Sequence, residues 1–146
     1  MLNVSIVLYR PDWQQVTDLA TVILLSNHVR RIYLIDNSPA PTSPESLDSR
    51  ITYRHNPYNM GYGAAHNIAI RESIYDEVPF HLVINPDIIL TPEALDAMLQ
   101  FIAQHPEVGA LMPKVTYPDG RLQYLCKLLP TPIDVFGRRF LPSQWM

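Results

Sequence analysis

Polar residues follow apolar runs at four places along the chain, and their types suit binding of a nucleotide, a sugar or a metal ion. They are Tyr9 and Arg10, Asp36 and Asn37, Asn59 and Gly61 with Asn67 beyond them, and Asn85 with Asp87. Carboxylates accept hydrogen bonds or hold divalent cations, and glycine lets a backbone approach a ligand closely. The alternative at each place is that Asn, Asp and Gly merely end a strand. Four such places together favour a ligand site.

The stretch HNPYNMGYGAAHNIAI, residues 55–70, contains two of the five glycines of the chain, Gly61 and Gly63. Glycine permits a positive φ or close approach of the backbone to a ligand. The helix predicted after them would offer free N–H groups and the positive end of its dipole to an anion. Asn59 and Asn67 would fix this loop or bind a nucleotide sugar directly. The alternative is that the glycines serve only the loop-to-helix geometry.

The segment GYGAAH, residues 61–66, nearly matches the dinucleotide-binding fingerprint G-x-G-x-x-G. That fingerprint follows the first strand of a βαβ unit, whereas this segment follows the third predicted strand. His66 also occupies the position where a small residue allows close helix packing. Both features argue against NAD binding.

Two carboxylates could bind different parts of a nucleotide. Asp36 ends the apolar run IYLID and can accept a hydrogen bond from a ring imide N–H of uracil or thymine, or it caps the following turn. Asp87 follows Asn85 and Pro86, and the proline makes this turn rigid. It would hold Mg²⁺ or Mn²⁺ beside substrate phosphates, since these metals often use only one or two protein carboxylates. The alternative for Asp87 is an Asx turn before a helix.

The apolar pattern predicts elements that would bring these residues together. Strands are predicted over residues 4–9, 31–36, 51–55, 80–85 and 108–117, and helices over 12–27, 63–73 and 91–104. A Pro/Ser-rich loop is predicted over residues 37–50, and a turn at YPDG, residues 117–120. Alternating strands and helices predict an α/β sandwich with a mostly parallel sheet. In such sheets ligands bind at the carboxyl ends of the strands, where the polar residues lie.

Composition indicates one globular domain over residues 1–146. The chain is 47% hydrophobic and 17% charged, with a net charge of -3, so no broad basic surface predicts nucleic-acid binding. Cys126 is the single cysteine, which fits a reducing compartment. The first residues lack the basic start of a signal peptide, and no apolar run approaches the roughly 18 residues of a membrane span. We therefore expect a cytoplasmic protein.

Five segments together resemble family 2 glycosyltransferases, most of all the rhamnosyltransferase-like branch. They are VSIVLYR, IYLIDNS, NPYNMGYGAAHNIAI, LVINPDIIL and VGALMPKVTYPDGRLQ, in the order seen in that family. The resemblance covers about residues 3–140. It implies a GT-A type, Rossmann-like αβα sandwich, incomplete at its C-terminus, a nucleotide-sugar donor and a divalent metal.

The resemblance also implies roles for the residues at the strand ends. The segments at Tyr9 and Asp36 would hold the nucleoside, and the loop from Asn59 through the following helix would lie near the donor. Asn85-Pro86-Asp87 stands for the D-x-D metal motif of the family. Because Asn85 replaces the first acid, Asp87 would carry the metal role alone.

The implied activity is inverting transfer of a sugar such as rhamnose in cell-surface polysaccharide synthesis. The donor would be UDP- or dTDP-linked, and the acceptor a glycan or a lipid-linked sugar. Family members carry an acidic base in a later segment, but no E-D-x-D-type segment occurs here, and neither Asp119 nor Asp134 is convincing. We expect the base beyond Met146. The alternative is a truncated, non-catalytic relative that folds, oligomerises and at most binds nucleotide.

The tail of the chain is apolar, with Phe136, Phe140, Leu141, Trp145 and Met146. Exposed apolar residues of this kind predict a contact. The partner would be the missing segment, a second copy of the chain, or the inner face of a membrane.

Overall fold

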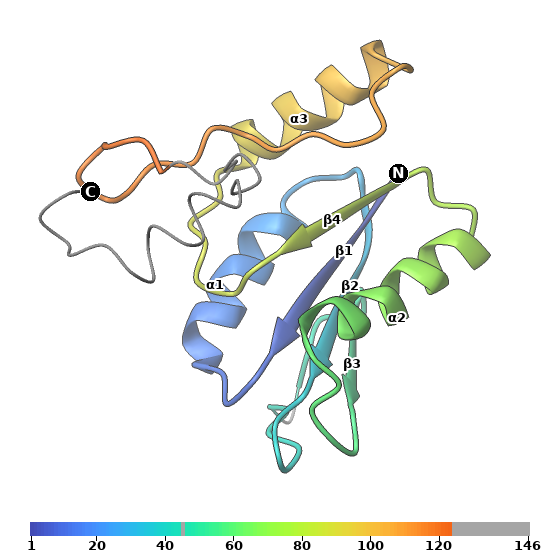
Figure 1. Cartoon of the computed structure of the whole chain (residues 1–146), viewed down its shortest axis with the longest axis vertical. Helices are drawn as coiled ribbons and strands as arrows, with labels where there is room; N and C mark the ends of the chain where they lie inside the picture. Colours follow the sequence, from blue (N-terminus) through green and yellow to red (C-terminus); the bar gives the residue numbers. More distant parts are fainter. Residues whose placement is uncertain (45, 124–146) are drawn as a thin grey trace, which may run out of the picture. The chain divides into compact units, whose positions relative to one another are not determined.

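The computed structural model describes residues 1–44 and 46–123. The chain forms two compact units, Met1–Glu107 and a second that begins at Val108. The first unit holds every named strand and helix of the described residues (Figure 1). Cys126, Asp134 and the apolar tail lie outside the described residues, so the expectations about them, and about a single domain over 1–146, stay predictions.

The first unit is built on a four-stranded sheet in which every neighbouring pair of strands is parallel. Its strands are β1 (Leu2–Leu8), β2 (Val29–Asp36), β3 (Ile51–His55) and β4 (Phe80–Ile84), in the order β3-β2-β1-β4. The central strands β1 and β2 are buried almost throughout, as their continuous apolar runs predict. The predicted parallel sheet is confirmed, and the central strands begin two residues earlier than predicted.

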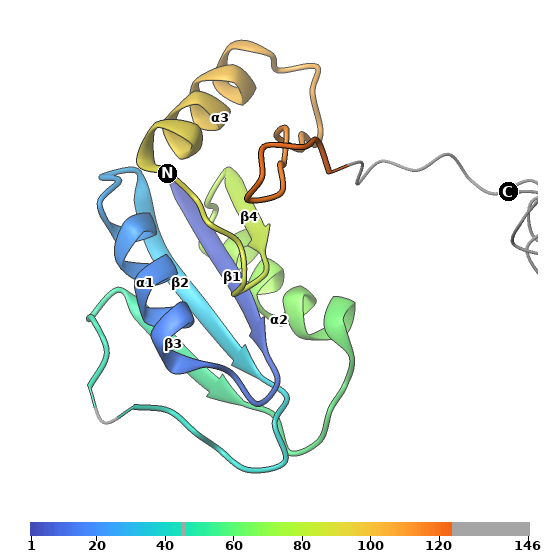
Figure 2. The ribbon, with the colours of Figure 1, turned by 90° about the vertical axis from the view of Figure 1, so that its left-hand side faces the viewer.

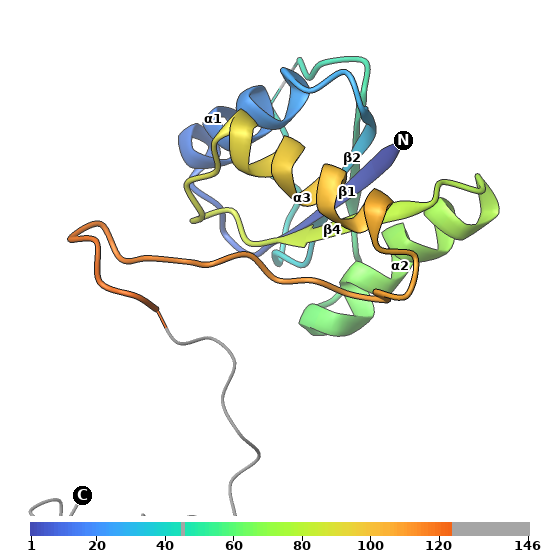
Figure 3. The ribbon, with the colours of Figure 1, turned by 90° about the horizontal axis from the view of Figure 1, so that it is seen from above.

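Helices cover both faces of the sheet. They are α1 (Trp13–Leu24), α2 (Tyr62–Tyr75) and α3 (Pro92–Gln104). Val16 and Ile23 of α1 and Leu95 of α3 share one core with β1, whereas Ala65 and Ala69 of α2 pack on the opposite face. Figure 3 shows α1 and α3 on one side of the sheet and α2 on the other, and Figure 2 shows α1 in front of the strands. The expected three-layer αβα fold is therefore confirmed.

The helix starts agree with the sequence prediction, and the first helix ends sooner than predicted. Asp12 Oδ1 accepts a hydrogen bond from Gln14 N at 2.9 Å, and Thr91 Oγ1 accepts one from Ala94 N at 3.2 Å. Helix α1 ends at Leu24 rather than near residue 27. The chain must turn before β2 begins at Val29, and short-range bonds such as Leu25 N to Val22 O tighten this last turn.

The strand predicted over residues 108–117 is wrong for the described part of the second unit. Only one isolated antiparallel bridge forms there, between Thr116 and Leu122. Pro113 has no N–H to donate to a ladder, and an apolar run becomes a strand only where a partner strand pairs with it. The predicted YPDG turn is confirmed, because Gly120 N donates to Tyr117 O at 2.9 Å and Gly120 has a φ of +84°.

Within residues 1–44 and 46–123, no helix combines the length and the apolar character that crossing a membrane requires.

Candidate functional site

The parallel sheet brings the predicted polar residues to one edge. In the register of the strands, Leu8 pairs with Asp36, and Asp36 pairs with His55. The loops after all four strands therefore leave from the same edge. The chain runs from β1 to β2 and β3 on one side and returns to β4 on the other side of β1. Ligands of open parallel sheets bind at such a reversal of strand order, here between the loops after β1 and β4.

Asp36 is fully buried and is held by its own neighbours. Its Oδ1 accepts a hydrogen bond from Ser38 N at 2.8 Å, and its Oδ2 accepts bonds from Tyr53 Oη at 2.6 Å and Thr42 Oγ1 at 3.3 Å. Burial alone would raise the pKa of Asp36, but these hydrogen bonds hold it below its usual value. The carboxylate thus caps the turn after β2, which was the alternative for this residue. Its contact with a nucleoside stays a prediction.

Asn37 belongs to the framework of the same edge. It is 3% exposed, and its Oδ1 accepts a hydrogen bond from the buried Asn56 Nδ2 at 2.8 Å. Asn37 Nδ2 donates to Gly61 O at 3.4 Å, which joins the loop after β2 to the loop before α2. Arg10, which has a φ of +50°, donates its N–H to Ser38 Oγ at 2.7 Å. These bonds connect the loops that follow β1, β2 and β3.

The loop before α2 uses one of its two glycines for backbone geometry. Gly61 has a φ of +86°, as the sequence allowed, and its N–H donates to Asn59 Oδ1 at 2.9 Å. Gly63 lies in the first turn of α2 without a positive φ. A Cβ at either glycine would meet no protein atom within 4 Å, so the surface before the helix N-terminus is open. Asn67 is exposed on α2.

The rim of this edge is aromatic and basic. Tyr9 is 53% exposed, and the guanidinium of Arg10 lies 5.5 Å from the centroid of its ring. Tyr58 and Tyr62 of the loop before α2 are also more than half exposed. Flat rings and a cation at an open edge are suited to stacking on a base or sugar and to pairing with phosphate.

The turn after β4 presents Asn85 and Asp87, both exposed. Asn85 O accepts a hydrogen bond from Ile88 N at 3.4 Å, and Asn85 Oδ1 accepts one from Tyr62 Oη at 2.7 Å. Within residues 1–44 and 46–123, no cluster of three or more His, Cys, Asp or Glu residues could hold a metal ion. A carboxylate with a neighbouring amide oxygen nevertheless fits a Mg²⁺ or Mn²⁺ ion that takes its other ligands from phosphate and water.

Comparison with known proteins agrees with the parallel α/β fold. Residues 19–140 match Glycosyl transferase family 2. The chain belongs to this family. It is 27% identical, over 91% of its length, to N-acetylglucosaminyl-diphospho-decaprenol L-rhamnosyltransferase of Mycobacterium tuberculosis, in strain CDC 1551 / Oshkosh and in strain ATCC 25618 / H37Rv. The chain spans about half of these relatives, 47% of their length. A segment of 81 residues is 32% identical to the uncharacterized protein y4gI of Sinorhizobium fredii, of which it covers 8%.

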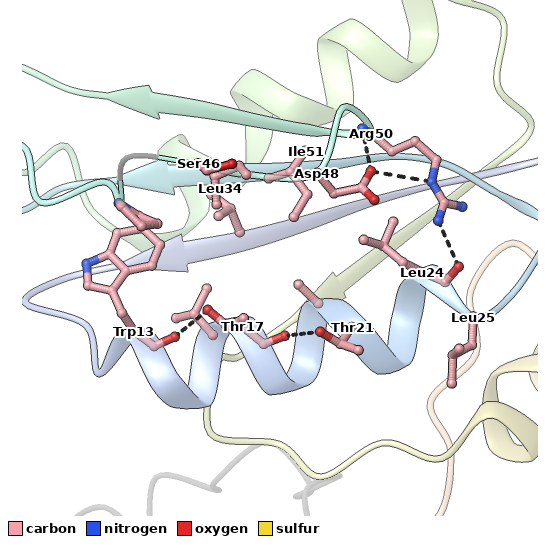
Figure 4. A pocket seen from close by; sticks show the side chains of 14 residues that line it. Trp13, Thr17, Thr21, Leu24, Leu25, Leu34, Ser46, Asp48, Arg50 and Ile51 are labelled. Atoms are coloured by element: carbon pink, nitrogen blue, oxygen red, sulfur yellow. Dashed lines mark hydrogen bonds and ion pairs between the residues drawn. The ribbon is translucent and has the colours of Figure 1, made fainter.

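A cavity also lies in another part of this family 2 chain, apart from the polar residues that follow the strands. It has a volume of about 400 Å³ and lies between α1 and the segment before β3, with Trp13 at one end and Arg50 at the other (Figure 4). Arg50 Nη2 donates to Leu24 O at 3.0 Å and its Nε lies 3.6 Å from Asp48 Oδ1. None of the predicted site residues lines this cavity.

The family 2 chain places several residues at the site that the sequence interpretation missed. Ser38, Thr42, Tyr53, Asn56 and Tyr62 hold the carboxylate and amide groups of the predicted residues. Of these, only Asn56 follows a strand directly, in the sequence HNP, and could have been found by the rule that identified the others.

The sequence interpretation also missed a buried network of hydrogen-bonded polar side chains under α2. Ser5 Oγ of β1 lies 2.7 Å from His66 Nδ1 and 2.8 Å from His81 Nε2, and His81 Nδ1 lies 2.7 Å from Ser73 Oγ. Ser73 Oγ also accepts a bond from Asn3 Nδ2 at 3.0 Å. Burial lowers the pKa of His66, and burial together with the nearby His66 lowers the pKa of His81 to about 4. Both imidazoles are therefore neutral at pH 7.

These histidines should make the family 2 chain less stable in mild acid. The unfolded chain takes up protons near pH 6.5, whereas folded His81 does so only near pH 4, so stability falls as the pH drops through this window. We expect a loss of about 1 to 2 kcal/mol between pH 7 and 4.5, less than the pKa difference alone would give because His81 is partly exposed. Urea denaturation across this range measures it. His81→Gln should flatten the slope, and a slope equal to that of the parent chain would contradict the assignment.

Proposed function

We propose that this chain forms the donor-binding part of an inverting glycosyltransferase that uses a UDP- or dTDP-linked sugar. The observation that carries the proposal is the meeting of two segments at the reversal of strand order. The N-terminus of α2, after Gly61, and the turn that carries Asp87 are joined there by the bond from Tyr62 to Asn85. A helix N-terminus attracts phosphate, and a carboxylate beside it suits the metal that accompanies a diphosphate.

The sugar and the acceptor are proposed from the relatives. The Mycobacterium tuberculosis proteins are named as rhamnosyltransferases that act on N-acetylglucosaminyl-diphospho-decaprenol. We propose rhamnose as the transferred sugar and a lipid-linked or glycan hydroxyl as the acceptor. Such an acceptor would place the reaction at the cytoplasmic face of a membrane.

Each group of the site would have one task in the reaction. The open N-terminus of α2 would orient the diphosphate, Tyr9 and Arg10 would flank the nucleoside, and Asp87 with Asn85 would hold the metal. A bound Mg²⁺ or Mn²⁺ would neutralise the charge that develops on the diphosphate leaving group. The hydrogen bonds of Asp36 and Asn37 would keep the loops after β1, β2 and β3 at fixed separations.

The general base is not assigned within the described residues. A base must lie within about 3 Å of the acceptor proton or reach it through one water. Asp119 is engaged by Arg121, whose N and Nε donate to its two oxygens at 3.0 and 2.7 Å. These bonds lower the pKa of the Asp119 carboxyl, which makes it a weak proton acceptor.

The purified chain should bind UDP and dTDP at least about fivefold more tightly than ADP and GDP, and should transfer no sugar by itself. We expect the preference because the Asp36 carboxylate can accept a hydrogen bond from the ring imide N–H of uracil or thymine. We expect no transfer because no base is assigned within the described residues. Calorimetry with the four nucleotides measures the first, and an acceptor-dependent assay with dTDP-rhamnose measures the second. Equal binding of purine nucleotides would contradict the donor assignment, and robust turnover would place a base inside residues 1–146.

A further inference from the structure

Tyr62 lies where the loop before α2 meets the turn after β4. It is the first residue of α2 and follows Gly61, whose positive φ directs the chain into the helix. Its Oη donates to Asn85 Oδ1 at 2.7 Å, which joins segments 23 residues apart. Among the described residues, this is the side-chain hydrogen bond that connects the two segments.

The ring of Tyr62 packs against a buried side chain although Tyr62 itself is 51% exposed. His66, one helical turn later, packs against it with ring centroids 4.4 Å apart and an interplanar angle of 73°. His66 is only 3% exposed and is bonded to Ser5 of the central strand at 2.7 Å. A continuous set of contacts therefore runs from β1 through His66 and Tyr62 to Asn85.

The hydroxyl of Tyr62 remains a hydrogen-bond donor at neutral pH. Burial, and then the negative charge of Asp87, raises the pKa of Tyr62 above its usual value of 10.0. The bond inside the turn, from Ile88 N to Asn85 O, is long at 3.4 Å. The shorter bond from Tyr62 is thus the stronger restraint on Asn85.

We propose that Tyr62 is a positioning residue that holds the Asn85-Pro86-Asp87 turn against the loop before α2. The held turn would keep Asp87 close to the first turn of α2, where a diphosphate would meet the helix N-terminus. The role in metal-dependent binding rests on the function proposed above. The restraint on the turn itself rests only on the contacts of Tyr62.

Tyr62→Phe tests the role, because phenylalanine keeps the packing on His66 and removes only the hydroxyl. Calorimetry of the full chain with UDP and with dTDP should show the Mn²⁺-dependent gain in affinity falling about five- to tenfold. Binding without metal should change less than about twofold. The matched control is Tyr75→Phe, the same change at an 85% exposed tyrosine at the C-terminal end of α2, which should leave both values unchanged. An unchanged Mn²⁺-dependent gain in Tyr62→Phe would overturn the positioning role.

A double-mutant cycle with Asn85→Ala separates positioning from a general loss of structure. If Tyr62 acts through Asn85, Tyr62→Phe should weaken Mn²⁺-dependent binding by less than about twofold once Asn85 is alanine. Additive effects of the two substitutions would show that Tyr62 acts by another route, and would overturn the proposal.

Hydrogen exchange of the ligand-free chain tests the restraint without any nucleotide. Amides of residues 84–90 should exchange at least about threefold faster in Tyr62→Phe than in the parent or in Tyr75→Phe. Unchanged exchange would overturn the restraint. If the parent chain shows no Mn²⁺-dependent gain, the metal part of the proposed function fails, and the exchange rates alone decide whether Tyr62 holds the turn.

Discussion

Replacing Asp36 with alanine should lower the free energy of unfolding by about 3 kcal/mol, or roughly 6 to 12 °C in melting temperature. The change leaves the hydroxyls of Tyr53 and Thr42 and the N–H of Ser38 without their acceptor at a fully buried position. Urea denaturation and thermal melting measure the loss. Tyr53→Phe, which removes one donor and leaves the carboxylate, should lose about 1 kcal/mol.

Asp48→Ala is the matched control for Asp36→Ala. Asp48 also caps a turn, since its Oδ1 accepts a bond from Arg50 N at 2.8 Å, but its side chain is 43% exposed. We expect a loss below about 1 kcal/mol there, because water replaces the lost partner. Equal losses at the two positions would contradict the role of burial at Asp36.

The same Asp36 variant tests the predicted nucleoside contact at a temperature where it remains folded. UDP should then bind about tenfold more weakly, a loss of about 1.4 kcal/mol. Unchanged affinity in the folded variant would remove Asp36 from the nucleotide site and leave it as a framework residue.

Asp87→Asn should remove the gain that Mn²⁺ gives to UDP or dTDP binding, a loss of tenfold or more, and leave the fold intact. Asp87 is exposed and is the only acid of the turn, so in the proposed function its charge would hold the metal, and its loss should not disturb the core. Calorimetry with and without Mn²⁺ measures the gain, and thermal melting checks the fold.

Asp18→Asn provides the control for Asp87→Asn. Asp18 is exposed on α1 and lines, together with Asp87, a cavity of about 320 Å³. Asp18→Asn removes the same charge near the turn. Mn²⁺-dependent binding should persist in this variant. A gain that survives in Asp87→Asn, or is absent from the parent chain, would leave Asp87 as a turn residue only.

The parallel sheet, and the edge at which the polar residues lie, could be predicted because both follow from local patterns. Continuous apolar runs such as those around Ile6 and Leu34 identify strands buried on both faces, and parallel strands end at one edge. The sequence therefore predicts Asp36 and Asn85 at that edge. Nothing in the sequence indicated that the hydroxyl of Tyr53 would donate a hydrogen bond to Asp36.

Contacts between distant segments could not be predicted in the same way. The bonds of Ser5 with His66 and His81 span 61 and 76 residues, and no short motif encodes them. The strand predicted over residues 108–117 failed for a related reason. Its apolar residues met the local criterion, but pairing with a neighbouring strand is a property of the whole fold.

The pairing of β1 with both β2 and β4 has a consequence for the order in which the chain folds. Leu2 pairs with Val29 and also with Phe80, so the second contact closes a far longer loop than the first. Loop-closure entropy delays the longer contact. The strands β1, β2 and β3 can therefore assemble as one cooperative unit before β4 docks at their edge. If β4 alone separated from β1, the Asp87 turn would move away from the loop before α2 while the rest of the sheet stays folded.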